Sequence, residues 1–310
     1  MLSRIAESLF WIGRYVERAE DTCRILDVHL QLLVEDPTVD EEEAAGALLG
    51  VMGVDAARGV RPASDLILEC LCYDANSSTS IVASLLAARE SARRARETIS
   101  LEMWEGINTT WHEVAGDEWA GMRPASALRT VRERCTMLVG VADQTMIHDE
   151  GWQFVVLGRN LERADMTARL ICSALLNAES PMAWSNALRA CGAHHAFVRA
   201  YGGHSSDVEA AEFLLLDRLF PRSLVHALST AEGALISLED QERRLGITDR
   251  ASMLLGRARA ELEYRPPNEV MTGLFNQMTR LQAACAEASR AIGDRYFLGG
   301  HADAWQGGLL

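Results

Sequence analysis

The chain carries one helical stretch twice, and this repeat constrains its fold more than any other feature. Residues 11–26 read WIGRYVERAEDTCRIL, and residues 156–171 read VLGRNLERADMTARLI, 145 positions further along. Seven residues recur identically, and Glu20 recurs as Asp165 with its charge kept. The identical pairs are Gly13 and Gly158, Arg14 and Arg159, Glu17 and Glu162, Arg18 and Arg163, Ala19 and Ala164, Thr22 and Thr167, and Arg24 and Arg169. Because internal repetition fixes an architecture before any local assignment, we predict two related helical halves, about 1–147 and 148–300.

Both copies have the apolar spacing of an amphipathic helix. At about 100° per residue, Gly13, Glu17, Glu20 and Arg24 share a stripe about 60° wide. An apolar arc adjoins this stripe, so the carboxylates are expected at the border of the core. A glycine inside a helix is less favourable than alanine by about 1 kcal/mol. Its presence in both copies indicates that something large passes close to the backbone, either a bulky side chain or the partner helix.

Two hypotheses account for the repeated charges. In the first, each helix pairs its own charges, for example Arg14 with Glu17 at i,i+3 spacing and Glu20 with Arg24 at i,i+4 spacing. The charges can also pair between the helices if these cross. In the second, the carboxylates converge at a pseudo-two-fold axis, where nearby arginines tune their pKa values for acid–base chemistry. The candidate cluster is the same in both cases: Arg14, Glu17, Arg18, Glu20, Arg24, Arg159, Glu162, Arg163, Asp165 and Arg169.

The composition favours helices throughout. Only 6% of the 310 residues are aromatic and 7 are proline, while alanine, leucine and arginine are common. We predict a single all-helical bundle over residues 1–310, with the two repeated helices near its centre and residues 301–310 as a flexible tail. Long helices are also expected over residues 80–108 and 268–293.

The predicted helix over residues 80–108 carries a dense band of charge. Arg89 and Arg93 lie one turn apart in this band and are secondary candidates for the site. They either complement the stripe of Glu17 and Glu20 or bind an anion. The alternative is a solvated face whose charges pair locally.

The charge and the ends of the chain exclude several classes of function. A formal net charge of −14 argues against sequence-independent binding to nucleic acid. Glu7, Arg14 and Glu17 stand where a signal peptide needs an apolar core, and no apolar run approaches the roughly 18 residues of a membrane span. Seven cysteines without a CxxC pair suggest reduced thiols. We expect a cytoplasmic protein that contacts neither nucleic acid nor a membrane.

Motifs for cofactors and metals are missing from the sequence. It contains no phosphate-binding loop, no GxGxxG after a strand, no GxSxG elbow and no HExxH. The Glu17-x-x-Glu20 and Glu162-x-x-Asp165 pairs have the spacing of carboxylate ligands but lack the histidine of a di-metal bundle. We predict no cofactor and no metal.

The stretch MLSRIAESLFWIGRYVERAEDTCRILDVHL, together with LGRNLERADMTARLI, resembles the alpha-E domain family. Further similarity in the segments around SIVASLLAARESARRARE and FLLLDRLFPRSL extends it over nearly the whole chain. The resemblance implies an all-helical fold without a settled biochemical activity. Its Glu-Arg signature falls on Glu17-Arg18 with Glu20, and on Glu162-Arg163 with Asp165. Cys23 and Asn76-Ser77 depart from the expected pattern, outside the charged motif.

Members of that family resemble partners of circularly permuted ATP-grasp enzymes, often alongside a transglutaminase-like or proteasome-like peptidase. The resemblance therefore implies an accessory, non-catalytic component of a system that forms or remodels amide bonds. Such a component would bind the ATP-grasp ligase or a peptide-like substrate through an open groove. A homo-oligomer is a further partner hypothesis.

Two alternatives stay open. An enzyme with Glu17 or Glu162 as general acid or base predicts a pocket of convergent carboxylates, at least one with a raised pKa. A purely structural scaffold predicts that the charges are fully paired and that no pocket opens on them.

Overall fold

The computed structural model describes residues 1–54, 63–202, 206–239 and 249–297. These residues are organised as helices, with no strand among them. The all-helical prediction is therefore confirmed. The predicted tail, residues 301–310, lies outside the described residues.

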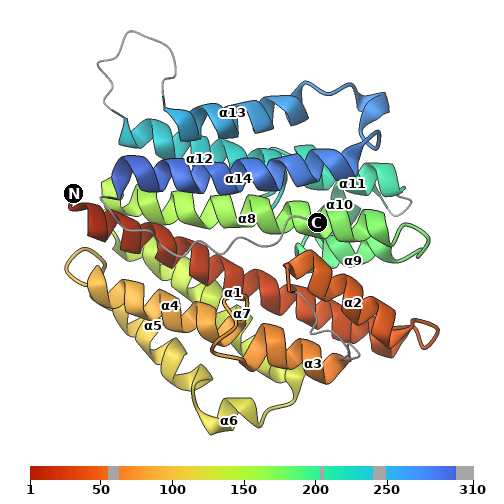
Figure 1. The fold of residues 1–310 in the computed structure, drawn as a ribbon, viewed down its shortest axis with the longest axis horizontal. Helices are drawn as coiled ribbons and strands as arrows, with labels where there is room; N and C mark the ends of the chain where they lie inside the picture. Colours follow the sequence, from red (N-terminus) through yellow and green to blue (C-terminus); the bar gives the residue numbers. More distant parts are fainter. Residues whose placement is uncertain (55–62, 203–205, 240–248, 298–310) are drawn as a thin grey trace.

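Two long helices form the centre of the bundle. Helix α1 (Ser3–Glu35) and helix α8 (Glu150–Leu176) hold the two copies of the repeat, run in the same direction and pack against each other (Figure 1). Helix α1 ends just before Asp36-Pro37, because the residue before a proline is disfavoured in a helix. The Asp149 side chain caps α8 by accepting a hydrogen bond from the Gly151 N–H at 2.8 Å.

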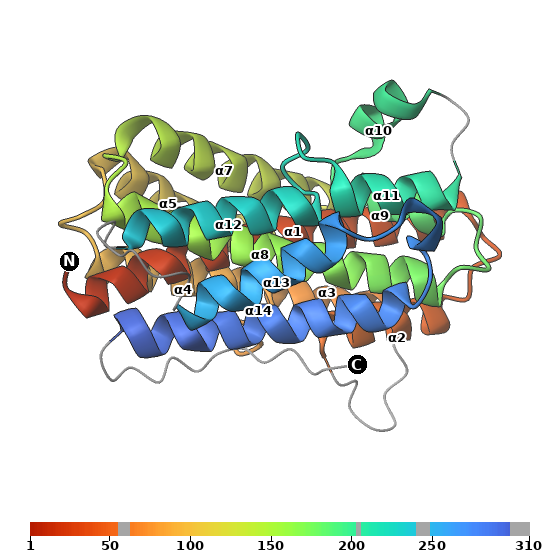
Figure 2. The same cartoon turned by 90° about the horizontal axis from the view of Figure 1, so that it is seen from above.

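Each long helix packs against two helices of its own half of the chain, and a third helix lies behind these two. Helices α4 (Ile81–Arg94) and α7 (Pro124–Thr145) pack on α1, with α5 (Leu101–Val114) behind them. In the second half, α12 (Leu224–Leu238) and α14 (Leu274–Tyr296) pack on α8, and α13 (Arg250–Glu263) packs on both. Figure 2 shows these last three helices side by side along the bundle.

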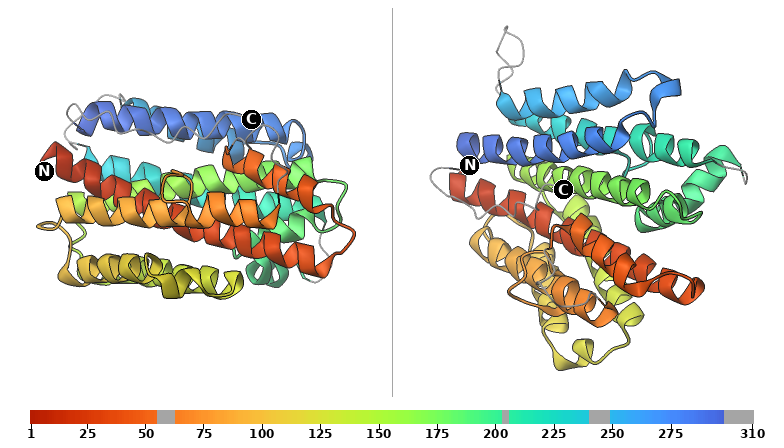
Figure 3. Two further views of the ribbon diagram at one scale, coloured as in Figure 1. Left: turned by 60° about the horizontal axis from the view of Figure 1, so that its bottom comes forward. Right: turned by 45° about the vertical axis from the view of Figure 1, so that its right-hand side comes forward.

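Shorter elements complete the fold, and several gather where α1 and α8 end (Figures 1 and 3). They are α2 (Glu41–Met52), α3 (Ser64–Leu68), the π-helical turn η1 (Glu69–Tyr73), α6 (Asp117–Ala120), α9 (Ala183–Ala190), α10 (His194–Tyr201), α11 (Asp207–Leu216) and the 3₁₀ turn η2 (Pro267–Glu269). Of these, α2 and α9 pack against α8, and α9 also packs against α1.

The prediction of one helix over residues 80–108 is wrong. The chain leaves the helix after Arg94 and starts α5 at Leu101. The Ser100 side chain caps the new helix by accepting a hydrogen bond from the Met103 N–H at 3.1 Å, so that α5 folds back on α4. The last helix also begins later than predicted, at Leu274, after the 3₁₀ turn η2 and a left-handed Gly273 (φ 62°).

Candidate functional site

Helices α1 and α8 touch backbone to backbone at the two repeated glycines. A Cβ atom on Gly13 would lie 2.2 Å from the carbonyl oxygen of Val155, and one on Gly158 would lie 2.0 Å from that of Phe10. Neither distance is sterically tolerable for carbon and oxygen. The expectation that the partner helix passes close to these glycines is confirmed. The contact sets the register of the charged side chains that follow on both helices.

Glu162 of α8 lies between two arginines of α1. Its carboxylate accepts hydrogen bonds from Arg14 Nε at 2.6 Å and from Arg18 Nε at 2.6 Å and Nη2 at 3.1 Å. The side chain is 0% exposed. Burial alone would raise the pKa of Glu162, but the two arginines outweigh it and bring this pKa down to about 2.

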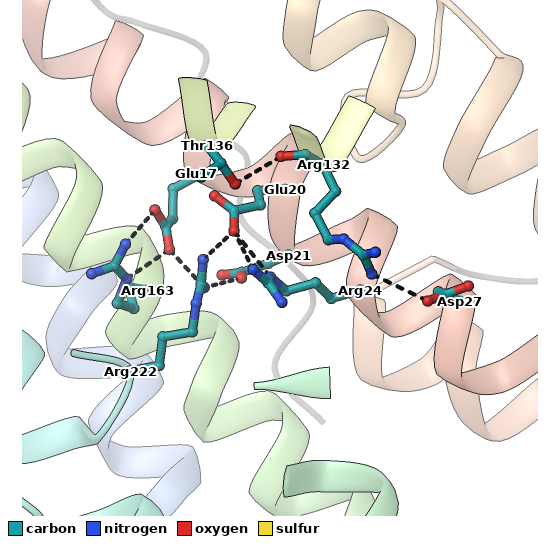
Figure 4. A network of polar contacts seen from close by, with 9 residues as sticks. All are labelled: Glu17, Glu20, Asp21, Arg24, Asp27, Arg132, Thr136, Arg163 and Arg222. Carbon is teal, nitrogen blue, oxygen red and sulfur yellow. Dashed lines mark hydrogen bonds and ion pairs between the residues drawn. The ribbon is translucent and has the colours of Figure 1, made fainter. Parts of the chain in front are cut away.

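Glu17 of α1 has a corresponding position against α8. It accepts hydrogen bonds from Arg163 Nε at 2.7 Å and Nη2 at 2.8 Å, and from Arg222 Nη1 at 2.8 Å (Figure 4). Burial works against its charge, and Arg163 and Arg222 again lower the pKa of Glu17 to about 2. The two Glu-Arg dipeptides thus exchange partners, because each glutamate pairs with the arginine of the other copy.

A second layer of pairs lies one turn further along each helix. Glu20 accepts from Arg24 Nη2 at 2.7 Å, and Asp165 accepts from Arg169 Nε at 2.9 Å. Both pairs have the predicted i,i+4 spacing. The predicted i,i+3 pair of Arg14 and Glu17 is wrong, because the helix crossing brings Glu162 to Arg14 instead.

Arg159 is the exception among the ten candidate residues. Its counterpart Arg14 binds Glu162, whereas Arg159 pairs with Asp143 of α7 at 3.6 Å and bonds to none of the other nine. Its Nε is buried and has no hydrogen-bond partner in the part of the chain that the structure describes. Burial and the neighbouring Arg163 lower the pKa of Arg159. The place beside Glu17 is taken by Arg222, which comes from outside the repeat.

Arg222 joins three carboxylates of α1. Besides Glu17 it donates to Glu20 at 2.8 Å and to Asp21 (Figure 4). Burial raises the pKa of Asp21, Arg222 opposes this effect, and Glu17 and Glu20 add to it, so that the pKa is about 7. Asp21 is therefore the carboxyl of this cluster that takes up a proton near neutral pH.

Asp21 and Arg222 were missed as site residues. Asp21 is present in one copy only, since its counterpart is Met166, and the search for shared residues passed over it. Arg222 directly precedes Ser223, whose side chain caps α12 by accepting from the His226 N–H at 3.2 Å. The one signal available for Arg222 was its place in the segment FLLLDRLFPRSL.

The secondary candidates Arg89 and Arg93 do not join the cluster. Arg89 donates to Asn108 at 2.8 Å and to Glu90 at 3.1 Å, and Arg93 donates to Glu90 at 3.0 Å. Their predicted contact with the stripe of Glu17 and Glu20 is wrong, because both arginines donate hydrogen bonds to residues of α4 and α5 instead. Of the predicted local pairs, that of Glu90 and Arg93 at i,i+3 spacing is confirmed.

Two cavities among the described residues lie apart from the Glu-Arg cluster. A cavity of 640 Å³ lies between α1, α2, α8 and α9, and one of 460 Å³ lies beside α12 and α13. None of the ten candidate residues lines either.

The structure also bears on metals, thiols and membranes. Within the described ranges, no three histidine, cysteine, aspartate or glutamate side chains are placed to hold a metal ion. All seven cysteines are free, and six are buried. Among the described helices, none has the length and apolar character needed to cross a membrane.

Comparison with known proteins identifies relatives that are themselves uncharacterised. The uncharacterized protein Rv2567 of Mycobacterium tuberculosis (strain ATCC 25618 / H37Rv) is 26% identical over 322 residues, which cover 94% of this chain and 36% of the relative. The uncharacterized protein Mb2597 of Mycobacterium bovis has the same identity and coverage. This chain thus spans about a third of their length. No solved structure matches it.

A family model gives the remaining evidence. The model named Alpha-E, "a predicted alpha-helical domain with a conserved ER motif", matches residues 1–297. Two Glu-Arg dipeptides of this chain, Glu17-Arg18 and Glu162-Arg163, form the buried contact described above. Because the match covers nearly all of the chain, the protein belongs to the Alpha-E family.

Proposed function

We propose that this protein is a non-catalytic binding module and that its two Glu-Arg pairs hold α1 and α8 together. One observation carries the proposal: Glu17 and Glu162 are both 0% exposed, and each accepts hydrogen bonds from two arginines. Removing one partner from a buried ion pair leaves an uncompensated charge, so such pairs resist any change in protonation.

The same geometry argues against acid–base catalysis by these glutamates. A general acid or base works best with a pKa near the operating pH and within hydrogen-bond reach of a substrate. Glu17 and Glu162 have pKa values of about 2 and line neither of the two cavities. The rival hypothesis of an enzyme rests instead on Asp21, whose pKa is about 7. Asp21 is buried beneath Arg222 and also lines neither cavity.

We further propose that the module belongs to an amide-forming or peptide-modifying system. It would act there as an accessory to an ATP-grasp-type ligase, binding the ligase or a peptide-like substrate. The resemblance to the alpha-E family supports this role. The greater length of the relatives leaves room for additional domains in those proteins.

We also infer that the two halves arose by duplication. Supporting this, the contacts at the crossing are reciprocal, because Gly13 meets Val155 and Gly158 meets Phe10. Gly158 lies 145 positions after Gly13, and Val155 lies 145 positions after Phe10. Each long helix also packs against two helices of its own half, with a third behind these two, in a matching order.

The binding role is tested with a purified ATP-grasp-type ligase. We expect the two purified proteins to elute as a complex, and the complex to turn over ATP faster than the ligase alone. A triple variant, Arg14→Met, Arg18→Met and Glu162→Leu, replaces one buried charge cluster with apolar side chains of similar size and is expected to fold. If the folded triple variant binds the ligase and supports turnover, the cluster is structural. Amide formation by the chain alone, abolished in this variant, would overturn the proposal.

A further inference from the structure

The larger cavity lies at the end of the bundle where the two repeated helices end. Its volume of 640 Å³ is within the range of small-molecule sites. Both halves of the chain build it, because α1 and α2 supply one wall and α8 and α9 supply the other. Figures 1 and 3 show these four helices at the same end of the molecule.

Small apolar side chains line part of this cavity. Larger apolar residues such as Ile25, Leu48 and Leu170 complete the wall. The space exists because alanines face it from three helices. They are Ala44 and Ala47 of α2, Ala174 of α8, and Ala183, Ala187 and Ala190 of α9.

Polar side chains also contribute to the wall. They are His29, Thr38, Ser173, Asn177, Ser180 and Asn186. His29 is 8% exposed, and its Nε2 is covered by protein atoms and has no hydrogen-bond partner among the described residues. Asn186 is half-buried, and its side-chain amide can both donate and accept a hydrogen bond. The wall can therefore bind a polar group such as a peptide bond.

The charged residues that line the cavity are all acidic. Asp40, Glu43 and Glu179 are exposed at its mouth, and no arginine contributes to the lining. None of the three forms an ion pair with a described residue, although Asp40 accepts the Glu43 N–H as the cap of α2. A mouth with one sign of charge concentrates ligands of the opposite sign and repels carboxylates and phosphates.

We propose that this cavity binds the amino end of a short apolar peptide, with the protonated amine at the acidic mouth and the apolar side chains inside. Half-buried polar side chains of the lining, such as Asn186, hydrogen-bond the backbone of that peptide. The inference rests on the proposed role of the chain as a binding module and specifies the ligand class. It does not involve the Glu-Arg cluster, whose residues lie outside the cavity wall.

Calorimetric titration with three probes tests the ligand chemistry. Leucyl-leucine amide has the amine, the N–H groups and the apolar body. Its N-acetyl form lacks the charge, and hexylamine lacks the peptide group. We expect leucyl-leucine amide to bind at least ten times more tightly than either of the others. Equal binding of the acetylated form would overturn the role of the acidic mouth, and equal binding of hexylamine would overturn the peptide assignment.

Variants then locate the site. The double variant Glu43→Gln and Glu179→Gln should weaken binding of leucyl-leucine amide about fivefold or more and leave the acetylated form unaffected. A matched control, Glu102→Gln and Glu105→Gln, removes two exposed charges of α5 and should change nothing. Ala187→Leu should fill the cavity and abolish binding. Undiminished binding by a folded Ala187→Leu protein would place the ligand elsewhere and overturn the proposal.

A second measurement uses the fact that the sequence contains no lysine. Carbodiimide coupling with leucyl-leucine amide should attach the peptide first to Asp40, Glu43 or Glu179, as mapped by mass spectrometry. Labelling spread evenly over exposed carboxylates would count against the site. If the protein binds the peptide but forms no complex with the ligase, only the proposed ligase partner is overturned. If it forms the complex but does not bind the peptide, only the proposed peptide site in the cavity is overturned.

Discussion

Arg18 of α1 and Glu162 of α8 are joined by two hydrogen bonds, of 2.6 and 3.1 Å, between side chains that are 2% and 0% exposed. Arg163 and Glu17 form the corresponding pair from the opposite helices. Adjacent residues of a helix point in different directions, so they pair less readily than residues on two facing helices. Helices α1 and α8 are parallel and cross at glycines, so that each dipeptide supplies the partner for the other.

Glu162→Gln should therefore destabilise the protein by about 3–5 kcal/mol at pH 7, because Arg14 and Arg18 would keep their buried charge without a carboxylate. The pKa of Glu162 is lowered to about 2 from 4.5, so its contribution is fully present above pH 4.5 and is lost as the pH falls toward 2. The difference in the free energy of unfolding between variant and parent should therefore decrease as the pH falls below 4.5. Urea unfolding between pH 3 and pH 7 measures this.

Glu102→Gln is the control for that experiment, because Glu102 is exposed and forms no ion pair. It should change the free energy of unfolding by less than about 0.5 kcal/mol. If Glu162→Gln lowers the free energy of unfolding by less than about 1 kcal/mol, the ion pairs of Glu162 with Arg14 and Arg18 contribute little to the stability of the fold.

The helix crossing gives a prediction of its own. Gly13→Ala and Gly158→Ala each place a Cβ within 2.2 Å of a backbone oxygen, so the two helices must move apart. We expect a loss of about 3 kcal/mol or more for each, at the upper end of overpacking effects. Gly233→Ala in α12 is the matched control, since nothing lies within 4 Å of its added Cβ. That variant should instead stabilise by up to about 1 kcal/mol. Thermal melting of the three proteins would settle the order.

The crossing and the i,i+4 pairs could be predicted from the sequence because both follow from the repeat and the helical period. Gly13 and Gly158 recur at one offset, and Glu20 with Arg24 is a local pair. The pairing of Glu17 and Glu162 with arginines of the opposite helix depends on how the two helices meet. The sequence alone did not decide between ion pairs of this kind and a site for acid–base chemistry.

Other features left no local signal. Arg222 lies 201 positions from Asp21 and precedes a helix rather than belonging to one. The break between α4 and α5 falls in a segment whose composition favours a helix throughout, where Ser100 is a cap only because the chain turns. The position of Arg222 depends on a long-range contact, and the break between α4 and α5 depends on a reversal of the chain. Helical periodicity predicts neither.

Asp21→Asn should have the opposite pH dependence to Glu162→Gln. The pKa of Asp21 is raised to about 7 from 3.8, so its contribution is greatest below pH 4 and is lost as the pH rises through 7. Each pKa unit corresponds to about 1.4 kcal/mol, and shared charge in the cluster reduces the total. We expect Asp21→Asn to stabilise the protein by up to about 2 kcal/mol at pH 8 and by almost nothing at pH 4. A strong destabilisation at pH 8 would show that Asp21 and Arg222 form an obligatory pair.

Arg222→Met tests how the three carboxylates around this guanidinium are held. Glu17 would keep Arg163 and Glu20 would keep Arg24, but Asp21 would lose its one bonded arginine. At pH 8 we expect a loss of about 3–5 kcal/mol, as for other broken buried pairs. Asp21→Asn should stabilise the Arg222→Met protein by at least about 1 kcal/mol more than it stabilises the parent, because residues that share a network are not additive. Arg132→Met, which removes the half-buried partner of Asp27, is the control and should show no coupling to Asp21→Asn. Urea unfolding measures these free energies. If the effects of Arg222→Met and Asp21→Asn are additive, Arg222 stabilises the fold through its bonds to Glu17 and Glu20, and its bond to Asp21 contributes nothing.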